Sequence, residues 1–127
     1  MAQDYAYTVC IVDDDDAVRD SLKSLLEANG MRVRDFSSPV EFLKGDAAET
    51  CRCLILDLQM PDMSGIELLE TLRAQNIATP ALMVTGQPDP DLVLRLESAG
   101  RSTVLTKPVG EAELLARIEF AVASSLN

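Results

Sequence analysis

Five short apolar runs alternate with helical patterns along the chain, and this alternation constrains the fold more than any other feature. The runs expected to form strands are Tyr7–Val12, Met31–Phe36, Arg52–Leu56, Ala81–Val84 and Ser102–Thr106. Each is followed by apolar residues at helical spacing. Nearly continuous apolar strands that alternate with helices are typical of a parallel sheet covered on both faces. Since crossovers between parallel strands are right-handed, the sequence predicts an α/β fold with a doubly wound five-stranded parallel sheet.

Several helix boundaries carry signals of their own. The segments Ser38–Glu41 and Ser64–Glu67 each place a glutamate three residues after a serine, which is typical of a capping box. Asp89 followed by Pro90 resembles an N-cap and a first helical turn, and Gly100 fits the end of that helix. These signals predict one helix after each strand.

Length and composition limit the class of protein. The 127 residues suit one domain over residues 1–127, and a hydrophobic fraction of 47 % supports a real core. No apolar run reaches the roughly 18 residues of a membrane span, and the N-terminus lacks a signal-peptide pattern. We therefore expect a cytoplasmic location and no membrane contact. A net charge of −10 disfavours direct binding to nucleic acid.

The three cysteines are interpreted as small apolar side chains in or beside strands. Cys10, Cys51 and Cys53 have no histidine anywhere in the chain to complete a zinc site. The lack of histidine also removes the usual general base and excludes a histidine kinase that acts on itself.

Polar side chains follow four of the five predicted strands. Asp13 and Asp14 follow the first strand, Asp57 the third, Thr85 the fourth and Lys107 the fifth. A parallel sheet brings these positions to the edge at the carboxyl ends of its strands, where ligands bind in such folds. Three carboxylates and one ammonium carry a formal charge of −2, which a divalent cation would neutralise. Hard oxygen ligands favour Mg²⁺ for that role.

Each of these residues also has an ordinary structural explanation. The acidic run from Asp13 could be a first helical turn favoured by the helix dipole, and this is the expected role of Asp15 and Asp16. Asp57 could cap a turn, and Lys107 could be a solvated surface lysine. The repeated placement at strand ends favours a site over a set of unrelated surface residues.

The motifs Ile11–Asp14, Leu56–Gly65, Val84–Gly86 and Thr106–Pro108 resemble the response-regulator receiver domain of two-component signalling. Within that family the chain looks most similar to the receivers of FixJ-like transcriptional regulators. The resemblance covers essentially the whole chain. It implies a flavodoxin-like (βα)5 fold with strand order 2-1-3-4-5.

The resemblance implies a role for each acidic position. Asp57 resembles the phosphoryl acceptor, and Asp14 would bind Mg²⁺ directly. Asp13 would act mainly through metal-bound water, and Gln59 would supply a backbone carbonyl to the metal.

The resemblance also assigns the residues that face the phosphoryl group. Thr85 would donate its hydroxyl to one phosphoryl oxygen, and Lys107 would pair with another. The bond from Lys107 to Pro108 is expected to be cis. The positions implied to modulate the reaction are Gln59, Gly86, Gln87 and Val104. Because neither glutamine can deprotonate water, we expect slow self-dephosphorylation.

The implied phosphoryl donor is a sensor histidine kinase, a histidine phosphotransfer protein or a small acyl phosphate. The chain would catalyse only its own phosphorylation and slow dephosphorylation, and would switch a downstream partner or output domain. A homodimer through the fourth helix, fifth strand and fifth helix fits the family. A stand-alone receiver that serves as a phosphorelay intermediate or phosphate sink is the alternative.

Two other classes compete with the receiver interpretation. An aspartyl-phosphate phosphohydrolase would place a second acid two residues after Asp57, where this chain has Gln59. A flavodoxin would be expected to have more aromatic residues and a hydroxyl-rich loop after the first strand.

Two features depart from the family pattern. Val104 occupies the position, three residues before Lys107, where receivers usually carry Phe or Tyr. Pro88 and Pro90 restrict the loop after Thr85. Both features lie on the expected output surface, so the resemblance leaves the readout open.

Overall fold

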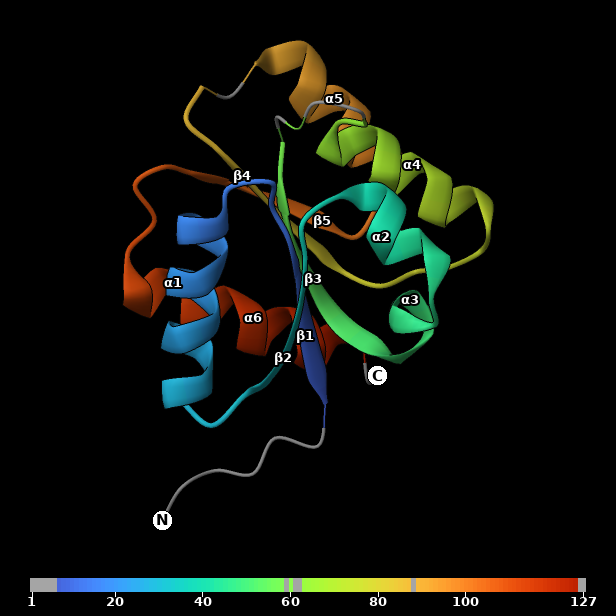
Figure 1. Cartoon of the computed structure of the whole chain (residues 1–127). Helices are drawn as coiled ribbons and strands as arrows, with labels where there is room; N and C mark the ends of the chain where they lie inside the picture. The colour runs from blue at the N-terminus through green and yellow to red at the C-terminus, as the bar shows by residue number, and fades with distance from the viewer. Residues whose placement is uncertain (1–6, 59, 61–62, 88, 126–127) are drawn as a thin grey trace.

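The computed structural model describes residues 7–58, 60, 63–87 and 89–125, which form five strands and six helices (Figure 1). In chain order these elements are β1 (Thr8–Val12), α1 (Asp16–Ala28), β2 (Arg32–Phe36), α2 (Pro39–Lys44), α3 (Ala47–Thr50), β3 (Cys51–Asp57), α4 (Gly65–Ala74), β4 (Ala81–Thr85), α5 (Pro90–Ala99), β5 (Ser102–Thr106) and α6 (Glu111–Ser125).

The five strands form one parallel sheet in the order β2-β1-β3-β4-β5. This confirms the predicted doubly wound fold and its strand order. Helices α1 and α6 cover one face of the sheet, and α2 to α5 cover the other (Figure 1). All carboxyl ends of the strands therefore point to the same edge.

Alternate residues of the central strands supply the cores on the two faces. Leu54 and Leu56 of β3 pack toward the α2–α5 side, whereas Ile55 packs with Ile118 of α6 on the other. Each fully buried aliphatic side chain contributes about 1.5–3 kcal/mol of hydrophobic stabilisation. The sheet is thus packed between helices on both faces. This packing holds the residues at the carboxyl ends of its strands in fixed positions.

The structure differs from the sequence prediction in the segment between β2 and β3. A second short helix, α3, follows α2 before the chain enters β3. At the start of α2, Ser38 Oγ accepts a hydrogen bond from Glu41 N, as expected. The Glu41 carboxylate, however, accepts from the backbone and hydroxyl of Ser37, one residue before the N-cap. The reciprocal capping box does form at Ser64 and Glu67.

All three cysteines are buried and free on strands β1 and β3. The Cys51 thiol donates to the carbonyl of Cys53 at 2.9 Å, and burial raises the pKa of Cys53 to about 12. These contacts confirm the interpretation of the cysteines as apolar strand residues.

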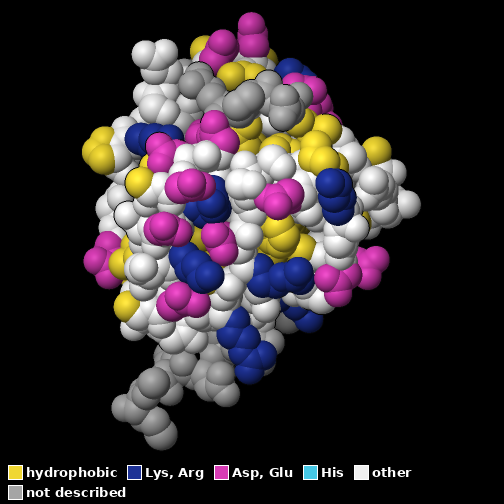
Figure 2. All heavy atoms as spheres, viewed as in Figure 1, with side chains coloured by type: hydrophobic (Ala, Val, Ile, Leu, Met, Phe, Trp, Pro, Cys, Tyr) yellow, Lys and Arg dark blue, Asp and Glu magenta, His cyan; other side chains and the backbone are white. Residues whose placement is uncertain are grey.

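Charged side chains of both signs cover the side of the molecule formed by α1 and β2 (Figure 2). Arg19 pairs there with Asp16 and Asp35, and Lys23 pairs with Asp35 as well. Within the described residues, no helix is long and apolar enough to cross a membrane.

Candidate functional site

Three carboxylates meet at the carboxyl edge of the sheet. One oxygen each from Asp13, Asp14 and Asp57 lies within 4.8 Å of the others. Asp13 is buried, Asp57 is half-buried and Asp14 is exposed, so the cluster opens to solvent on one side. The set consists of hard oxygen donors from few carboxylates, which suits a small divalent cation that keeps several waters.

Asp13 continues β1 and is held by its backbone and its side chain. Its N–H donates to the carbonyl of Phe36 at 3.1 Å, and its Oδ1 accepts from the backbone of Asp15 at 2.9 Å. Burial, together with the nearby charges of Asp57 and Asp14, raises the pKa of Asp13 above its ordinary value of 3.8. The hydrogen bond from Asp15 opposes that shift of the pKa. A cation placed among the three carboxylates would relieve this unfavourable electrostatic environment.

Lys107 approaches the same cluster from the end of β5. Its Nζ lies 3.9 Å from Asp57 Oδ1. Because the lysine side chain is 43 % exposed, this long ion pair contributes little to stability. The backbone N–H of Lys107 donates to the carbonyl of Thr85 at 2.8 Å, and the bond from Lys107 to Pro108 is cis. The ammonium is therefore positioned beside Asp57 without being tightly bound to it.

Thr85 ends β4 next to this group and is buried. Its Oγ1 accepts a hydrogen bond from the backbone of Gln87 at 3.2 Å. Gly86 and Gln87 are exposed beyond it, whereas Val104 on β5 is partly buried against the α2–α5 core. A hydroxyl, an ammonium and three carboxylates thus come from four different strand ends, as expected.

A close approach between α4 and β3 sets the position of Asp57. The N–H of Gly65 donates to the carbonyl of Leu58 at 3.1 Å. A Cβ atom on Gly65 would lie only 2.6 Å from the backbone oxygen of Asp57. Only glycine allows α4 to begin at this distance, a requirement that the sequence signal for a helix start did not reveal.

Comparison with known proteins decides which family this architecture represents. The family model of the response regulator receiver domain matches residues 9–119. The chain belongs to this family.

Relatives of the receiver domain include full-length regulators. FixJ of Rhizobium meliloti is 37 % identical over 115 residues, which cover 91 % of this chain and 56 % of FixJ. TodT of Pseudomonas putida F1 is 37 % identical over 119 residues, which cover 94 % of this chain and 52 % of TodT. The receiver thus spans about half the length of the curated relatives it matches.

Solved structures agree in fold. A crystal structure of FixJ-N has a TM-score of 0.82 and 37 % identity, with 94 % of this chain and 95 % of that chain covered. The response regulator StyR has a TM-score of 0.84 and 39 % identity, with coverage of 92 % and 59 %.

Two residues singled out from the sequence of the receiver, Gln59 and Pro88, lie outside the described residues. Pro90 is the first residue of α5, where its missing N–H costs no hydrogen bond. Asp89 caps that helix as expected, since its side chain accepts from the backbone of Asp91 at 2.9 Å.

An apolar groove of about 480 Å³ borders the site of the receiver beside Lys107. Its lining comes from α1, from β4, from the segment after β5 and from the start of α6, and comprises Val18, Leu22, Leu25, Val84, Lys107, Pro108, Val109 and Leu114. A larger cleft of about 740 Å³ lies at the opposite edge of the sheet and contains none of the site residues predicted from the sequence.

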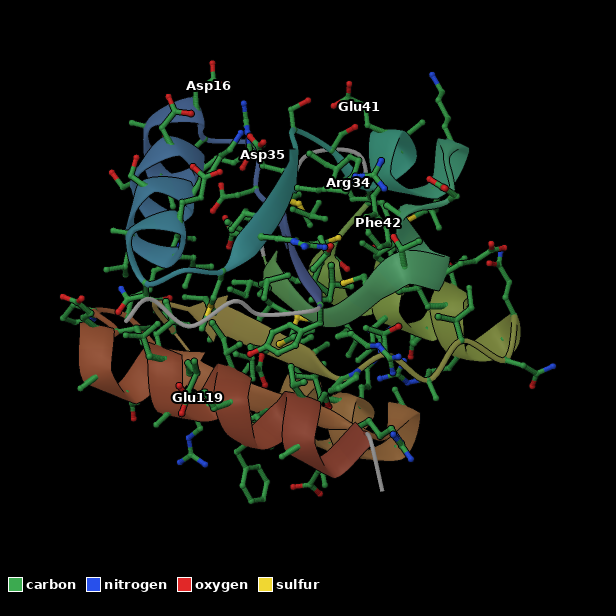
Figure 3. The ribbon with its side chains drawn as sticks, turned by 90° about the horizontal axis from the view of Figure 1, so that it is seen from below. Asp16, Arg34, Asp35, Glu41, Phe42 and Glu119 are labelled. Carbon is green, nitrogen blue, oxygen red and sulfur yellow. The ribbon has the colours of Figure 1, made fainter. Side chains whose placement is uncertain are left out.

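Arg19 contacts the acidic site and was not found by sequence reasoning. Its Nη1 donates to the backbone carbonyl of Asp13 at 2.8 Å, and its Nε donates to Asp35 at 3.0 Å. Figure 3 labels Asp16 and Asp35, its two carboxylate partners, on the neighbouring elements α1 and β2. An arginine one turn into a helix after an acidic run gives no sequence signal for such a contact.

Proposed function

We propose that this receiver domain accepts a phosphoryl group on Asp57 from a phosphohistidine donor in a Mg²⁺-dependent reaction. The convergence of Asp13, Asp14 and Asp57 at one edge of the sheet carries the proposal. Membership of the receiver family supports it, because receivers act as phospho-acceptors in two-component signalling.

In the proposed transfer, a carboxylate oxygen of Asp57 attacks the phosphorus in line with the donor. A new oxygen–phosphorus bond forms while the nitrogen–phosphorus bond of the donor breaks, and the electron pair stays on the imidazole. The Lys107 ammonium would neutralise one phosphoryl oxygen, and the Thr85 hydroxyl would donate a hydrogen bond to another. Since charge spreads over the phosphoryl oxygens, catalysis consists of positioning and charge stabilisation.

The proposed metal set is Asp14, Asp57 and the backbone carbonyl of Gln59, with Asp13 acting through water. A bound Mg²⁺ would supply positive charge to the phosphoryl oxygens. The raised pKa of Asp13 and the three converging carboxylates fit this cation. Hydrogen bonds within the chain, such as the one from the Asp15 N–H to Asp13 Oδ1, would hold the loop that carries Asp13 and Asp14 in place.

Release of the phosphoryl group to water would be slow. The chain has no histidine, and the residues that follow Thr85 directly are Gly86 and Gln87. An amide such as that of Gln87 can orient water but cannot deprotonate it. The receiver would therefore catalyse its own phosphorylation and slow dephosphorylation without turning over an external substrate.

The proposed location of the receiver is the cytoplasm, and the proposed protein donor is a sensor histidine kinase or a histidine phosphotransfer protein. The apolar groove beside Lys107 would allow such a donor to bury aliphatic side chains while its phosphohistidine faces Asp57.

On the output side, the FixJ relatives are transcriptional regulatory proteins, so control of transcription through an output domain is proposed here too. Homodimerisation through α5, β5 and α6 fits that role, and a phosphorelay intermediate is the second candidate.

Intact-mass measurement after incubation with a small acyl phosphate and Mg²⁺ tests the assignment. We expect one added phosphoryl group on the native chain, none on Asp57→Asn, and normal labelling of Asp20→Asn, which changes an exposed acid on α1. Undiminished labelling of Asp57→Asn would overturn the site. Steady turnover of a generic phosphate ester would instead indicate a phosphohydrolase.

A further inference from the structure

Arg19 lies behind the acidic site, with its side chain only 13 % exposed. Its guanidinium donates to three acceptors: the backbone carbonyl of Asp13, Asp35 Oδ2 at 3.0 Å and Asp16 Oδ1 at 2.5 Å. Arginine can satisfy this arrangement because its planar fork presents several donors in fixed directions, which a lysine ammonium cannot do.

The carbonyl that Arg19 binds belongs to the peptide bond between Asp13 and Asp14. The neighbouring backbone is fixed on its other side, since Asp13 N–H donates to Phe36 of the β2 strand. The orientation of this peptide sets the position of the Asp14 backbone. It therefore also sets the positions that the exposed Asp14 carboxylate can occupy. Arg19 is thus the side chain that fixes the link between two of the three clustered acids.

The charge of Arg19 is cancelled locally. Asp16 and Asp35 lie against Arg19 and Lys23, so that two acids face two bases. The effect of Arg19 on the acidic cluster is therefore mainly geometric.

We propose that Arg19 is a positioning residue for the metal site: it holds the Asp13–Asp14 peptide so that the Asp14 carboxylate meets the cation. The proposal rests on the proposed function of this cluster as a Mg²⁺ site. Residues that orient metal ligands typically change metal affinity by about 10–100-fold when they are replaced.

Lys23→Gln is the matched control for Arg19→Gln. Both changes remove a cation that pairs with Asp35, but only Arg19 contacts Asp13. By calorimetric titration we expect Arg19→Gln to weaken Mg²⁺ binding about 10-fold and Lys23→Gln by less than about twofold. At saturating Mg²⁺ the labelling rate of Arg19→Gln should return to within about threefold of the native rate, because the phosphoryl-binding groups are unchanged.

A second measurement uses the metal-free protein. The N–H of Asp15 donates to Asp13 Oδ1, so a loosened loop should exchange this amide faster in Arg19→Gln and not in Lys23→Gln, as read by NMR. Asp35→Ala serves if Arg19→Gln fails to fold, and should weaken Mg²⁺ binding about threefold, because it removes only one bond that orients Arg19.

Native-like Mg²⁺ affinity in Arg19→Gln or Asp35→Ala, or an equal loss in Lys23→Gln, would overturn the role of Arg19. If the native chain itself binds no Mg²⁺, the proposed function fails and this role fails with it.

Discussion

Asp13 shows how a residue of a proposed metal site can oppose folding. Its carboxylate is buried beside two other acids, and its pKa is raised above 3.8. The folded chain therefore binds this proton more tightly than the unfolded chain does. In the metal-free protein, the contribution of Asp13 to the free energy of unfolding falls as the pH rises from 3.8 through the raised pKa.

The direction of this pH dependence leads to a prediction for the Asp13 side chain. Asp13→Asn removes the buried charge and should raise the melting temperature of the metal-free protein at pH 7 by about 2–6 °C, which corresponds to roughly 0.5–1 kcal/mol in a domain of this size. Below pH 3.8 the gain should vanish, because Asp13 is then protonated in both states. Thermal melts with a chelator check this. An equal gain in Asp20→Asn would instead indicate relief of general charge repulsion.

Asp14 and Asp15 are neighbours with different expected roles. Asp15 caps α1, because its carboxylate accepts from the backbones of Ala17 and Val18. Asp15→Ala should therefore cost about 1 kcal/mol of stability while Mg²⁺ still binds. Asp14→Ala should abolish Mg²⁺ binding with little loss of stability. Calorimetric titration and denaturant unfolding separate the two, and equal loss of Mg²⁺ binding would mean that the acidic run acts as a diffuse field.

At the scale of elements, the junction between β3 and α4 leaves no space at Gly65. An added Cβ would meet the backbone oxygen of Asp57 at 2.6 Å, so Gly65→Ala must push the helix or the strand end aside. We expect a loss of about 1–3 kcal/mol in the free energy of unfolding, measured with denaturant. Gly45→Ala is the control, since nothing lies within 4 Å of its added Cβ. A similar small effect of both changes would show that the junction can relax.

The strands and the longer helices could be predicted from the sequence, whereas the shortest helix could not. Strands and the longer helices follow from apolar spacing, and the capping box of α4 follows from Ser64 and Glu67. Helix α3 has only four residues and no side-chain cap, so neither periodicity nor capping marks it. The sequence also cannot show that the Glu41 carboxylate accepts from Ser37 and not from the N-cap residue Ser38, because the two serines are adjacent and chemically identical.

For the site, residue types at strand ends were informative because a parallel sheet aligns those ends. That reasoning predicts that Asp57, Thr85 and Lys107 lie at one edge of the sheet, and the structure brings them together there. It could not locate Arg19, because the contacts that tie it to this edge of the sheet are a backbone carbonyl and a carboxylate 16 positions away in the sequence. Contacts to backbone atoms depend on the folded path of the chain, which residue spacing does not encode.

At the scale of the whole molecule, the proposed phosphorylation of Asp57 would have to be transmitted to the proposed output surface formed by α5, β5 and α6. Val104 lies on β5, packed against the same core as Leu92 and Ala99 of α5. Its short β-branched side chain has few rotamers, so it offers little two-state movement compared with the aromatic residue usual in the family. Pro90 further restricts the start of α5.

We therefore predict that phosphorylation changes the conformation of the output surface only weakly. With beryllofluoride as the phosphoryl mimic, amide exchange should change near Asp57 and Thr85 but by less than about twofold across Asp89–Val109. Val104→Tyr should enlarge the change in that segment. Strong changes in the native chain there, together with dimerisation through α5, β5 and α6, would show that α5 moves without an aromatic residue.

The burial of all three cysteines makes this movement directly observable. Cys10 and Cys53 are fully buried and Cys51 is 5 % exposed, so a maleimide reagent has little access to any native thiol. Leu94→Cys would place one reactive thiol on α5, at a side chain that is 61 % exposed. A fluorophore attached there would report the position of α5 in an otherwise native chain, with no need to replace the cysteines that help to build the sheet.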